Sequence, residues 1–385
     1  MSDSTRVVAA IEGARNELIE LSHFIHAHPE LGYEEFQSYA VLADAAERWG
    51  FDVERGSAGL PTAFRATKGT GSFHVVYCAE YDALPEVGHA CGHNIIATSS
   101  LGAALGLAEM ADELDLRVTL LGTPSEEGGG GKIDLLNAGY FDDEHMALMV
   151  HPFPTERLDA ICLAVDQFDV IYSGKEAHAS AAPWLGRNAL DALTIAQVAL
   201  GLLRQQLQPG DQVHGVVAEG GSAANIIPSR TVGRFMVRSM TAESLAALRV
   251  RVNACFEAGA LATSTTLEYE EIGHQFSHMA ADPDILAHYR VAAEAIGRDF
   301  RLDDGGAPKP TISTDMANVS LALPSIHPLL MIPTHGAVNH QPEFTAACIT
   351  AAADQAVIDG AIALAETAVG VAHDAALRER LMKRS

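Results

Sequence analysis

Short apolar runs alternate with longer helical patterns along the first part of the chain. Runs of strand length occupy residues 73–79, 117–121 and 147–150, and stretches of helical length occupy residues 95–110 and 133–137. This alternation is typical of βαβ units, whose strands pair in parallel within one sheet. An opening helix is predicted at residues 7–26, with Pro29 closing the region.

The order of elements changes in the middle of the chain. Residues 164–274 read as strand, helix, strand, strand, helix, strand, which is typical of a ferredoxin-like α+β domain. The earlier pattern then resumes, with elements predicted at residues 283–296 (helix), 329–332 (strand) and 346–368 (an Ala-rich helix). We therefore predict an α/β domain with a mostly parallel sheet from residues 1–163 and 275–385, and an inserted α+β domain from residues 164–274. A chain of 385 residues is also long for a single core.

The composition is that of a folded protein and restricts the partners. Fifty acidic and 25 basic side chains give a net charge of −25, which repels nucleic acid phosphates and anionic membrane surfaces. We find no segment with the pattern of a signal peptide or a membrane span. The five cysteines lack the spacing of a disulfide framework. We expect a cytoplasmic protein with no nucleic acid or membrane partner.

Side chains that bind metals follow four of the predicted strands. The segments are EYDALPEVGHACGHN after residue 79, GTPSEEGGGGK after residue 121, HPFP after residue 150 and PTHGAVNHQPEF after residue 332. In open α/β sheets the functional crevice lies beyond the carboxyl ends of the strands. These four segments are therefore expected to converge although they are distant in sequence.

Cys91 and His93 form the most informative pair. Residues two apart face opposite sides of a helix, but an irregular turn at Gly92 lets both point at one site. Thiolate and imidazole suit zinc and its neighbours, whereas magnesium and calcium prefer oxygen. The alternative is an ordinary buried cysteine beside a histidine that caps a helix.

Two adjacent glutamates and several histidines complete the candidate set. One of Glu126 and Glu127 can bind a metal while the other exchanges a proton with water; the alternative is an exposed acidic pair at the start of the next helix. His151 stands at a strand end, and His335 competes with His340 for a ligand role in the last segment.

Six motifs in this order carry a family resemblance over nearly the whole chain. They are HPELGYEE, YDALPEVGHACGHN, SEEGGGGK, GKEAHAS, GGSAANIIP and NHQPEF. The chain resembles the aminoacylase/carboxypeptidase-type dinuclear metallohydrolases. Within them it is similar to the amidohydrolase branch, with its hippurate hydrolases, auxin-conjugate hydrolases, aminobenzoyl-glutamate hydrolases and peptidase-like dipeptidases.

The resemblance implies a pair of divalent ions and a role for each site residue. The implied metal ligands are Cys91, His93, Glu127, His151 and His340, with Cys91 bridging both ions. Glu126 is implied as the general base, and Asp82 as an aspartate that orients a ligand. Most of the branch has Asp after CGH, whereas this chain has Asn94, as on the dipeptidase-like and aminobenzoyl-glutamate hydrolase side.

The resemblance also gives the inserted domain a role as lid and dimerisation domain. His178 matches a lid histidine that stabilises the oxyanion, and Asn225 would help to hold the carboxylate of the substrate. Asp315 either lines the pocket or serves a loop or helix cap. A homodimer through residues 164–274 is therefore expected.

The implied function is hydrolysis of an amide bond in an N-acyl or N-aryl amino acid or a dipeptide-like substrate that carries a carboxylate. Water activated by two metal ions attacks the carbonyl, and Glu126 moves the proton to the departing amine. Zn²⁺ suits the ligands best, with Mn²⁺, Co²⁺ or Ni²⁺ as alternatives. Two rival hypotheses are an amidase whose nucleophile is Cys91, activated by His93 or His89, and a metal-containing binding protein without turnover.

Overall fold

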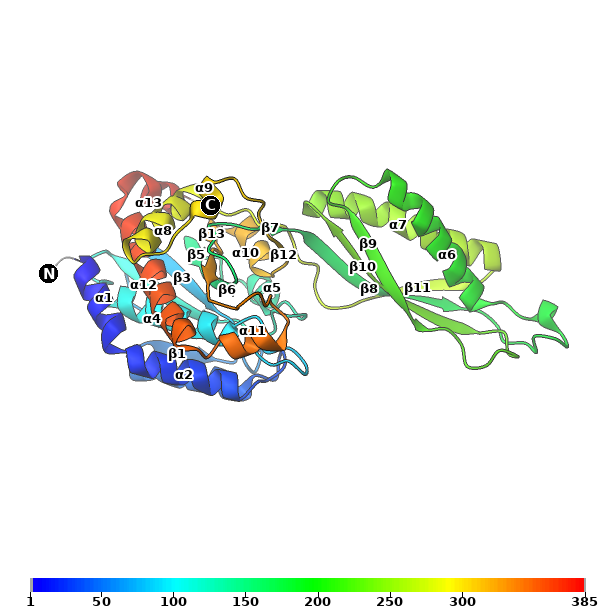
Figure 1. The fold of residues 1–385 in the computed structure, drawn as a ribbon, viewed down its shortest axis with the longest axis horizontal. Coiled ribbons are helices and arrows are strands. Elements are labelled where there is room, and N and C mark those ends of the chain that lie inside the picture. Colours follow the sequence, from blue (N-terminus) through cyan, green and yellow to red (C-terminus); the bar gives the residue numbers. More distant parts are fainter. Residues whose placement is uncertain (1–2, 384–385) are drawn as a thin grey trace. The chain divides into compact units, whose positions relative to one another are not determined.

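The computed structural model describes residues 3–383 and divides into two compact units (Figure 1). The larger unit comprises Met1–Ile161 with Met279–Ser385, and the smaller unit comprises Cys162–His278. The predicted division fell after residue 163 and before residue 275. The predicted fold class is confirmed, because one unit has a mostly parallel sheet and the other a separate antiparallel sheet.

The larger unit is organised around a six-stranded sheet. The strands lie in the order β1 (Asp52–Arg55), β2 (Phe64–Lys68), β4 (Leu116–Gly122), β3 (Phe73–Ala79), β5 (Met146–Leu148) and β13 (Ser325–Ile326). The pairings β3/β4, β3/β5 and β5/β13 are parallel, whereas β2 is antiparallel to β1 and β4. Strand β3 is apolar and largely buried, as expected for a strand covered on both faces.

Two buried helices form the centre of the packing in this unit. Helix α4 (His93–Ala108) lies against α12 (Ala351–His373), and a Cβ added at Gly102 would come within 2.9 Å of the Cβ of Ala361. This close approach explains the small residues on both helices. Among residues 3–383, α12 alone is long and apolar enough to cross a membrane, and 78% of the relevant window is buried inside the fold.

The other helices of the larger unit pack outside this pair or on the sheet. They are α1 (Asp3–Gly13), α2 (Arg15–Ala27), α3 (Phe36–Arg48), α5 (Gly131–Asn137), α8 (Pro283–Ala295), α9 (Arg301–Asp304), α10 (Met316–Ala322), α11 (Pro342–Ala347) and α13 (Ala375–Met382). The short elements are η1 (Ser57–Gly59), β6 (His151–Phe153), β12 (Thr311–Ile312) and β14 (Leu329–Met331), and β7 (Ile161–Cys162) falls at the boundary between the two units.

Two details of the sequence prediction were wrong. The opening helix is interrupted at Ala14, after a glycine that weakens helices. The long C-terminal helix begins at Ala351, because the Thr350 side chain accepts a hydrogen bond from the backbone N–H of Ala353. The predicted strand at residues 329–332 is present as β14, which pairs in parallel with β6 in a two-stranded sheet separate from the six-stranded one.

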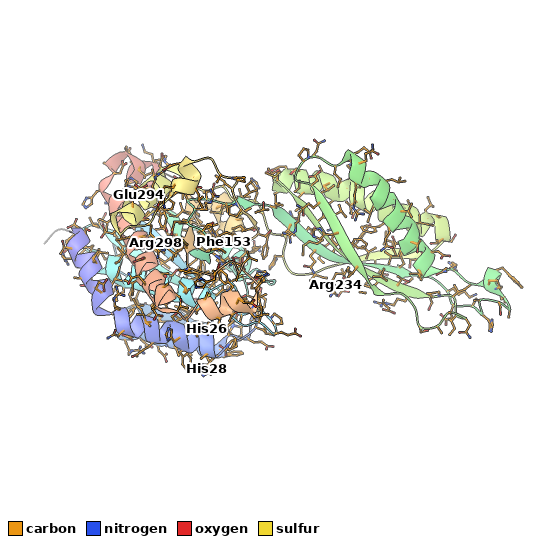
Figure 2. All side chains as sticks on the ribbon, viewed as in Figure 1. His26, His28, Phe153, Arg234, Glu294 and Arg298 are labelled. Carbon is orange, nitrogen blue, oxygen red and sulfur yellow. The ribbon has the colours of Figure 1, made fainter. Side chains whose placement is uncertain are left out.

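The smaller unit is an α+β domain with an antiparallel sheet. Its strands lie in the order β11 (Thr266–Glu271), β8 (Ala164–Ser173), β10 (Arg230–Ser239) and β9 (Gln212–Glu219). Helices α6 (Ala189–Leu203) and α7 (Ala242–Thr263) pack on this sheet, with η2 (Pro183–Leu185) and η3 (Arg204–Gln206) in the connections. Across β8 and β10, Arg234 (Figure 2) binds both carboxylate oxygens of Asp169 at 2.8 and 2.9 Å.

Candidate functional site

A tight turn before α4 positions Cys91 and His93. Gly92 has φ +75°, and a Cβ at this residue would lie 2.9 Å from the Cγ of Pro152. Both the left-handed backbone and the close approach therefore require glycine. The turn ends as His93 begins α4, so the irregular geometry predicted from the sequence is present here.

His93, which is buried, and His151, which is partly buried, each donate one ring N–H to a backbone carbonyl. The Nδ1 of His93 lies 2.8 Å from the carbonyl oxygen and 3.1 Å from the Oδ1 of Asp82. The Nδ1 of His151 lies 2.8 Å from the carbonyl oxygen of Pro152. Since these oxygens only accept, both Nδ1 atoms carry protons and both Nε2 atoms are available to bind a metal.

The five side chains implied as ligands form two groups that share one thiol. Potential ligand atoms of Cys91, His93 and His151 lie within 4.8 Å of one another, and so do those of Cys91, Glu127 and His340. The His340 Nε2 is 3.7 Å from the Oε2 of Glu127, and its side chain is the most exposed of the set. Two ion positions that share the Cys91 sulfur therefore fit this geometry.

Two buried polar atoms without hydrogen-bond partners indicate that cations bind at these positions. The Nε2 of His93 and the Oε1 of Glu127 are buried and have no hydrogen-bond partner within residues 3–383. Buried polar atoms are normally satisfied, and divalent ions at the two positions would satisfy these atoms. Thiolate, imidazole and carboxylate donors together suit a transition metal ion. The residues present therefore fit a two-ion site.

The charges around His93 lead to the same inference. Burial is the largest single influence on His93 and opposes its charge, but Asp82, Glu80 and Glu127 together outweigh burial and raise the pKa of His93 well above its usual value. A proton on His93 thus offsets part of the negative charge in the metal-free site. Metal binding would displace this proton, as is general for metal sites.

Glu126 lies beside the proposed ligands but inside the protein. Its Oε2 is 3.9 Å from the Nε2 of His93, and only 6% of the residue is exposed. Burial, together with the charges of Glu80 and Glu127, raises the pKa of Glu126 well above its usual range. The alternative of an exposed acidic pair at a helix start is wrong, since α5 begins only at Gly131.

Sequence reasoning missed Glu80 and Lys132. Glu80 follows β3 directly, and its Oε2 lies 3.5 Å from the Nε2 of His93. Ligand atoms of Glu80, His93 and Glu126 form a third group within 4.8 Å. The signal in the sequence was an acidic residue immediately after a buried apolar strand, close to the CGH cluster.

Asp315 and Asn94 have structural partners. Asp315 is fully buried and binds the backbone N–H and the Nζ of Lys132, so the prediction that it lines a substrate pocket is not retained. The Nδ2 of Asn94 donates to the Oγ of Ser22 at 2.9 Å and to the carbonyl oxygen of Cys348 at 3.1 Å. Asn94 therefore links α4 to two neighbouring segments.

His178 and Asn225 lie together in the smaller unit. The backbone N–H of Ala179 donates to the carbonyl oxygen of Asn225 at 3.0 Å, and His178 forms a β-bridge with Ile226. Both side chains are exposed on this unit.

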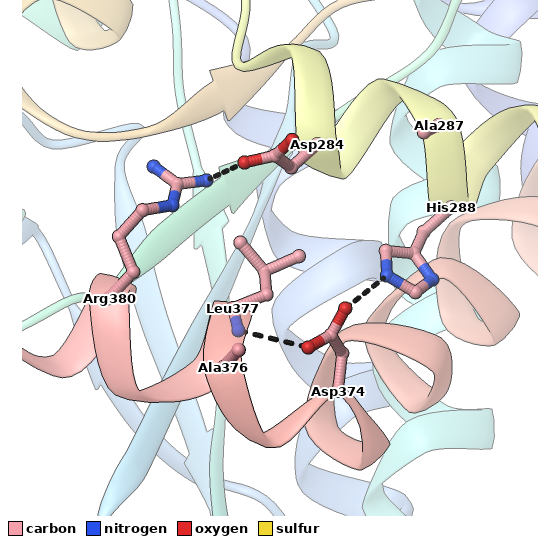
Figure 3. A pocket seen from close by; sticks show the side chains of 7 residues that line it. All are labelled: Asp284, Ala287, His288, Asp374, Ala376, Leu377 and Arg380. Atoms are coloured by element: carbon pink, nitrogen blue, oxygen red, sulfur yellow. Dashed lines mark hydrogen bonds and ion pairs between the residues drawn. The ribbon is translucent and has the colours of Figure 1, made fainter.

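Two pockets of the larger unit involve other residues. A hollow of about 790 Å³ is lined by residues of the loop before α11 and by α11 itself, including His335 and Gln341. His335 belongs to this hollow, whereas His340 belongs to a ligand group. A smaller pocket of about 380 Å³ lies between α8 and α13 (Figure 3), where Asp284 pairs with Arg380 and His288 with Asp374. This smaller pocket contains no residue predicted for the site.

Comparison with known proteins gives one consistent result. Residues 76–357 match the model of peptidase family M20/M25/M40. The chain is 37% identical to the Xaa-Arg dipeptidase of Mus musculus over 395 residues, which covers 98% of this chain and 91% of the relative. It is 32% identical to a p-aminobenzoyl-glutamate hydrolase chain of Escherichia coli over 280 residues, which covers 67% of this chain and 58% of that relative.

A solved structure shares the fold. The crystal structure of a dinuclear metal binding peptidase from the M20 family of Bacillus subtilis matches with a TM-score of 0.70 and 20% identity. The match covers 93% of this chain and 99% of that chain.

Proposed function

The chain belongs to peptidase family M20/M25/M40 and is a metal-dependent hydrolase of peptide or amide bonds. We propose that it cleaves dipeptides with a basic C-terminal residue. The main support is the set of buried ligand atoms near Cys91 that lack hydrogen-bond partners. The chain that carries them is similar along almost its whole length to an Xaa-Arg dipeptidase. The net charge of −25 would favour the approach of a cationic substrate.

The proposed mechanism assigns one task to each neighbouring glutamate. When bound, divalent ions at the two positions would supply Lewis acidity to the substrate carbonyl and lower the pKa of water. Glu127 would hold an ion, and Glu126 would accept the proton of the attacking water and return it to the departing nitrogen. A carboxyl whose pKa is raised by burial suits this return of the proton.

Residues of the smaller unit complete the proposal. We assign oxyanion stabilisation to His178 and a contact with the substrate carboxylate to Asn225. Helix α6 and strand β9 expose apolar side chains, with Val198, Leu202 and Val216 at 61, 72 and 62%, which supports the proposed homodimer through this unit. Sedimentation of the purified protein would test the dimer.

The rival hypothesis of a Cys91 nucleophile has less support. Burial, together with the charges of Glu127 and Glu126, raises the pKa of the Cys91 thiol well above its usual value, which opposes a free thiolate. Burial lowers the pKa of His89 to about 3, so that His89 would be a weak base for activating the thiol. The second rival, a binding protein without turnover, gives no role to the buried Glu126.

A substrate panel tests the proposed specificity. Purified protein loaded with Zn²⁺ or Mn²⁺ would be assayed with alanyl-arginine, alanyl-glutamate, an N-acetyl amino acid and p-aminobenzoyl-glutamate. We expect the highest kcat/KM for alanyl-arginine. Preference for the aryl amide would contradict the dipeptide assignment while leaving the amide hydrolase in place. Binding of alanyl-arginine without cleavage would favour the rival binding protein.

A further inference from the structure

A fully buried ammonium group lies behind the candidate metal site. The Nζ of Lys132 is 2.5 Å from the Oε1 of Glu80 and 2.7 Å from the Oδ1 of Asp315. The backbone N–H of Lys132 donates to the Oδ2 of Asp315 at 3.0 Å. All three residues have 0% exposure, so solvent contributes nothing to their charges. Such charges persist in a protein interior when they are paired and hydrogen-bonded.

This triad leaves one oxygen unsatisfied. Asp315 uses both carboxylate oxygens on Lys132, and Glu80 uses its Oε1 in the same way. The Oε2 of Glu80 is buried and lacks a hydrogen-bond partner in the described chain, as does the Nε2 of His93, which faces it at 3.5 Å. One lysine against two carboxylates also leaves a net negative charge. A cation in contact with both atoms would satisfy them and offset this charge.

We propose that Glu80 is an additional ligand, through its Oε2, of the ion held by His93, and that Lys132 and Asp315 are positioning residues that hold this carboxylate in place. The inference rests on the proposed two-ion site and adds an oxygen donor to a position otherwise built from sulfur and nitrogen. Since Lys132 holds the Oε1, Glu80 binds through one oxygen. An added carboxylate favours harder ions such as Mn²⁺ over the preference of Cys and His alone.

Metal titration of the full chain tests this inference. Wild type, Glu80→Gln, Lys132→Met and Asp315→Asn would be stripped of metal and titrated with Zn²⁺ and Mn²⁺ against a chelating indicator. We expect Glu80→Gln to weaken binding of one of the two ions by about 10- to 100-fold, more for Mn²⁺ than for Zn²⁺. The visible spectrum of the Co²⁺-loaded protein should change with it, because the number of ligands changes.

The matched control is Glu156→Gln. Glu156 is also a buried glutamate of the larger unit, but it binds Arg298 (Figure 2) at 3.2 Å and lies in none of the ligand groups of the described residues. This variant should bind both ions as the wild type does. Lys132→Met leaves two buried carboxylates without a cation and can fail to fold. If Lys132→Met does not fold, Asp315→Asn tests the contacts between Lys132 and Asp315 while retaining the ammonium group.

The outcomes separate this inference from the proposed function. Wild-type affinity for both ions in Glu80→Gln, with an unchanged Co²⁺ spectrum, would overturn the role of Glu80 and leave the two-ion hydrolase standing. If Glu80→Gln weakened Mn²⁺ binding while the folded Asp315→Asn bound Mn²⁺ as the wild type does, the positioning role of the triad would be overturned. A wild-type protein that binds fewer than two ions would overturn both proposals.

Discussion

Asp82 holds His93 through two contacts, since the Nδ1 of His93 lies 2.8 Å from its carbonyl oxygen and 3.1 Å from its Oδ1. The other carboxylate oxygen of Asp82, Oδ2, accepts a hydrogen bond from the backbone N–H of Glu127, with an N–O distance of 2.9 Å. One buried carboxylate thus fixes residues from two segments, one in each ligand group.

Asp82→Ala should therefore weaken both ion positions. Loss of a hydrogen-bond partner behind a ligand typically lowers metal affinity by about 10- to 100-fold. Titration of the metal-free variant with Zn²⁺ would measure this, with circular dichroism as the control for folding. Unchanged affinity at both positions would contradict the role given to Asp82.

Glu126→Gln should separate chemistry from metal binding. The amide has the shape of the carboxylate but cannot accept and return a proton, so kcat should fall by about 100- to 10,000-fold. Elemental analysis should still find two ions per chain, because Glu127 is intact. Substantial turnover in a variant with full metal content would refute the assignment.

The sequence predicted the ligand-type side chains that follow the strands, including those from distant segments, but missed the buried ion pairs whose partners are far apart along the chain. Cys91, Gly92 and His93 could be read as one turn because their roles depend on adjacent residues. The position of Glu80 directly after a strand was visible in the sequence, but its pairing was not, since its partner Lys132 is 52 positions away and the second carboxylate of the triad lies 183 positions beyond that lysine. The sheet was predictable from apolar runs, whereas the start of α12 depended on a single capping threonine.

Asn94→Asp should destabilise the protein even though aspartate is usual at this position in the branch that the chain resembles. The carboxylate would face the carbonyl oxygen of Cys348, which now accepts from the Nδ2 of Asn94. A buried acceptor left without a donor costs about 1–3 kcal/mol. Urea denaturation of the metal-free variants would measure the loss, and Asn94→Ala should lose less because it adds no charge. Greater stability of Asn94→Asp would contradict this account.

Glu35 should make stability depend on pH. Burial and the charge of Asp82 raise the pKa of Glu35 to about 7, from a usual value of 4.5. Between these two pH values the folded protein retains a proton that the unfolded chain loses. The stabilisation of the folded state by protonated Glu35 is therefore fully present below pH 4.5 and is lost as the pH rises through about 7.

Glu35→Gln provides the test of this sign. The variant keeps an acceptor for Thr62 or Ser125, which now donate to Glu35 at 2.8 Å each. The Tm of the variant should rise relative to wild type between about pH 5 and about pH 8. A difference that stays constant or shrinks would show that Glu35 ionises normally.

Metal removal should abolish turnover and destabilise the larger unit together. The buried ligand atoms that hold the ions are unsatisfied without them, and ions that bind only the folded chain stabilise it by about 2.7 kcal/mol at a concentration 100 times Kd. Chelation should therefore lower the Tm and eliminate activity, and added Zn²⁺ or Mn²⁺ should restore both. A thiol hydrolase would instead keep its turnover in the metal-free state, because Cys91 would need no ion to attack the substrate.

Alkylation cannot distinguish the metal-dependent hydrolase from the thiol hydrolase, since a thiol released from an ion also reacts with iodoacetamide. Full activity in protein shown by elemental analysis to lack metal would thus favour the nucleophile, whereas activity that returns in proportion to bound metal would exclude it.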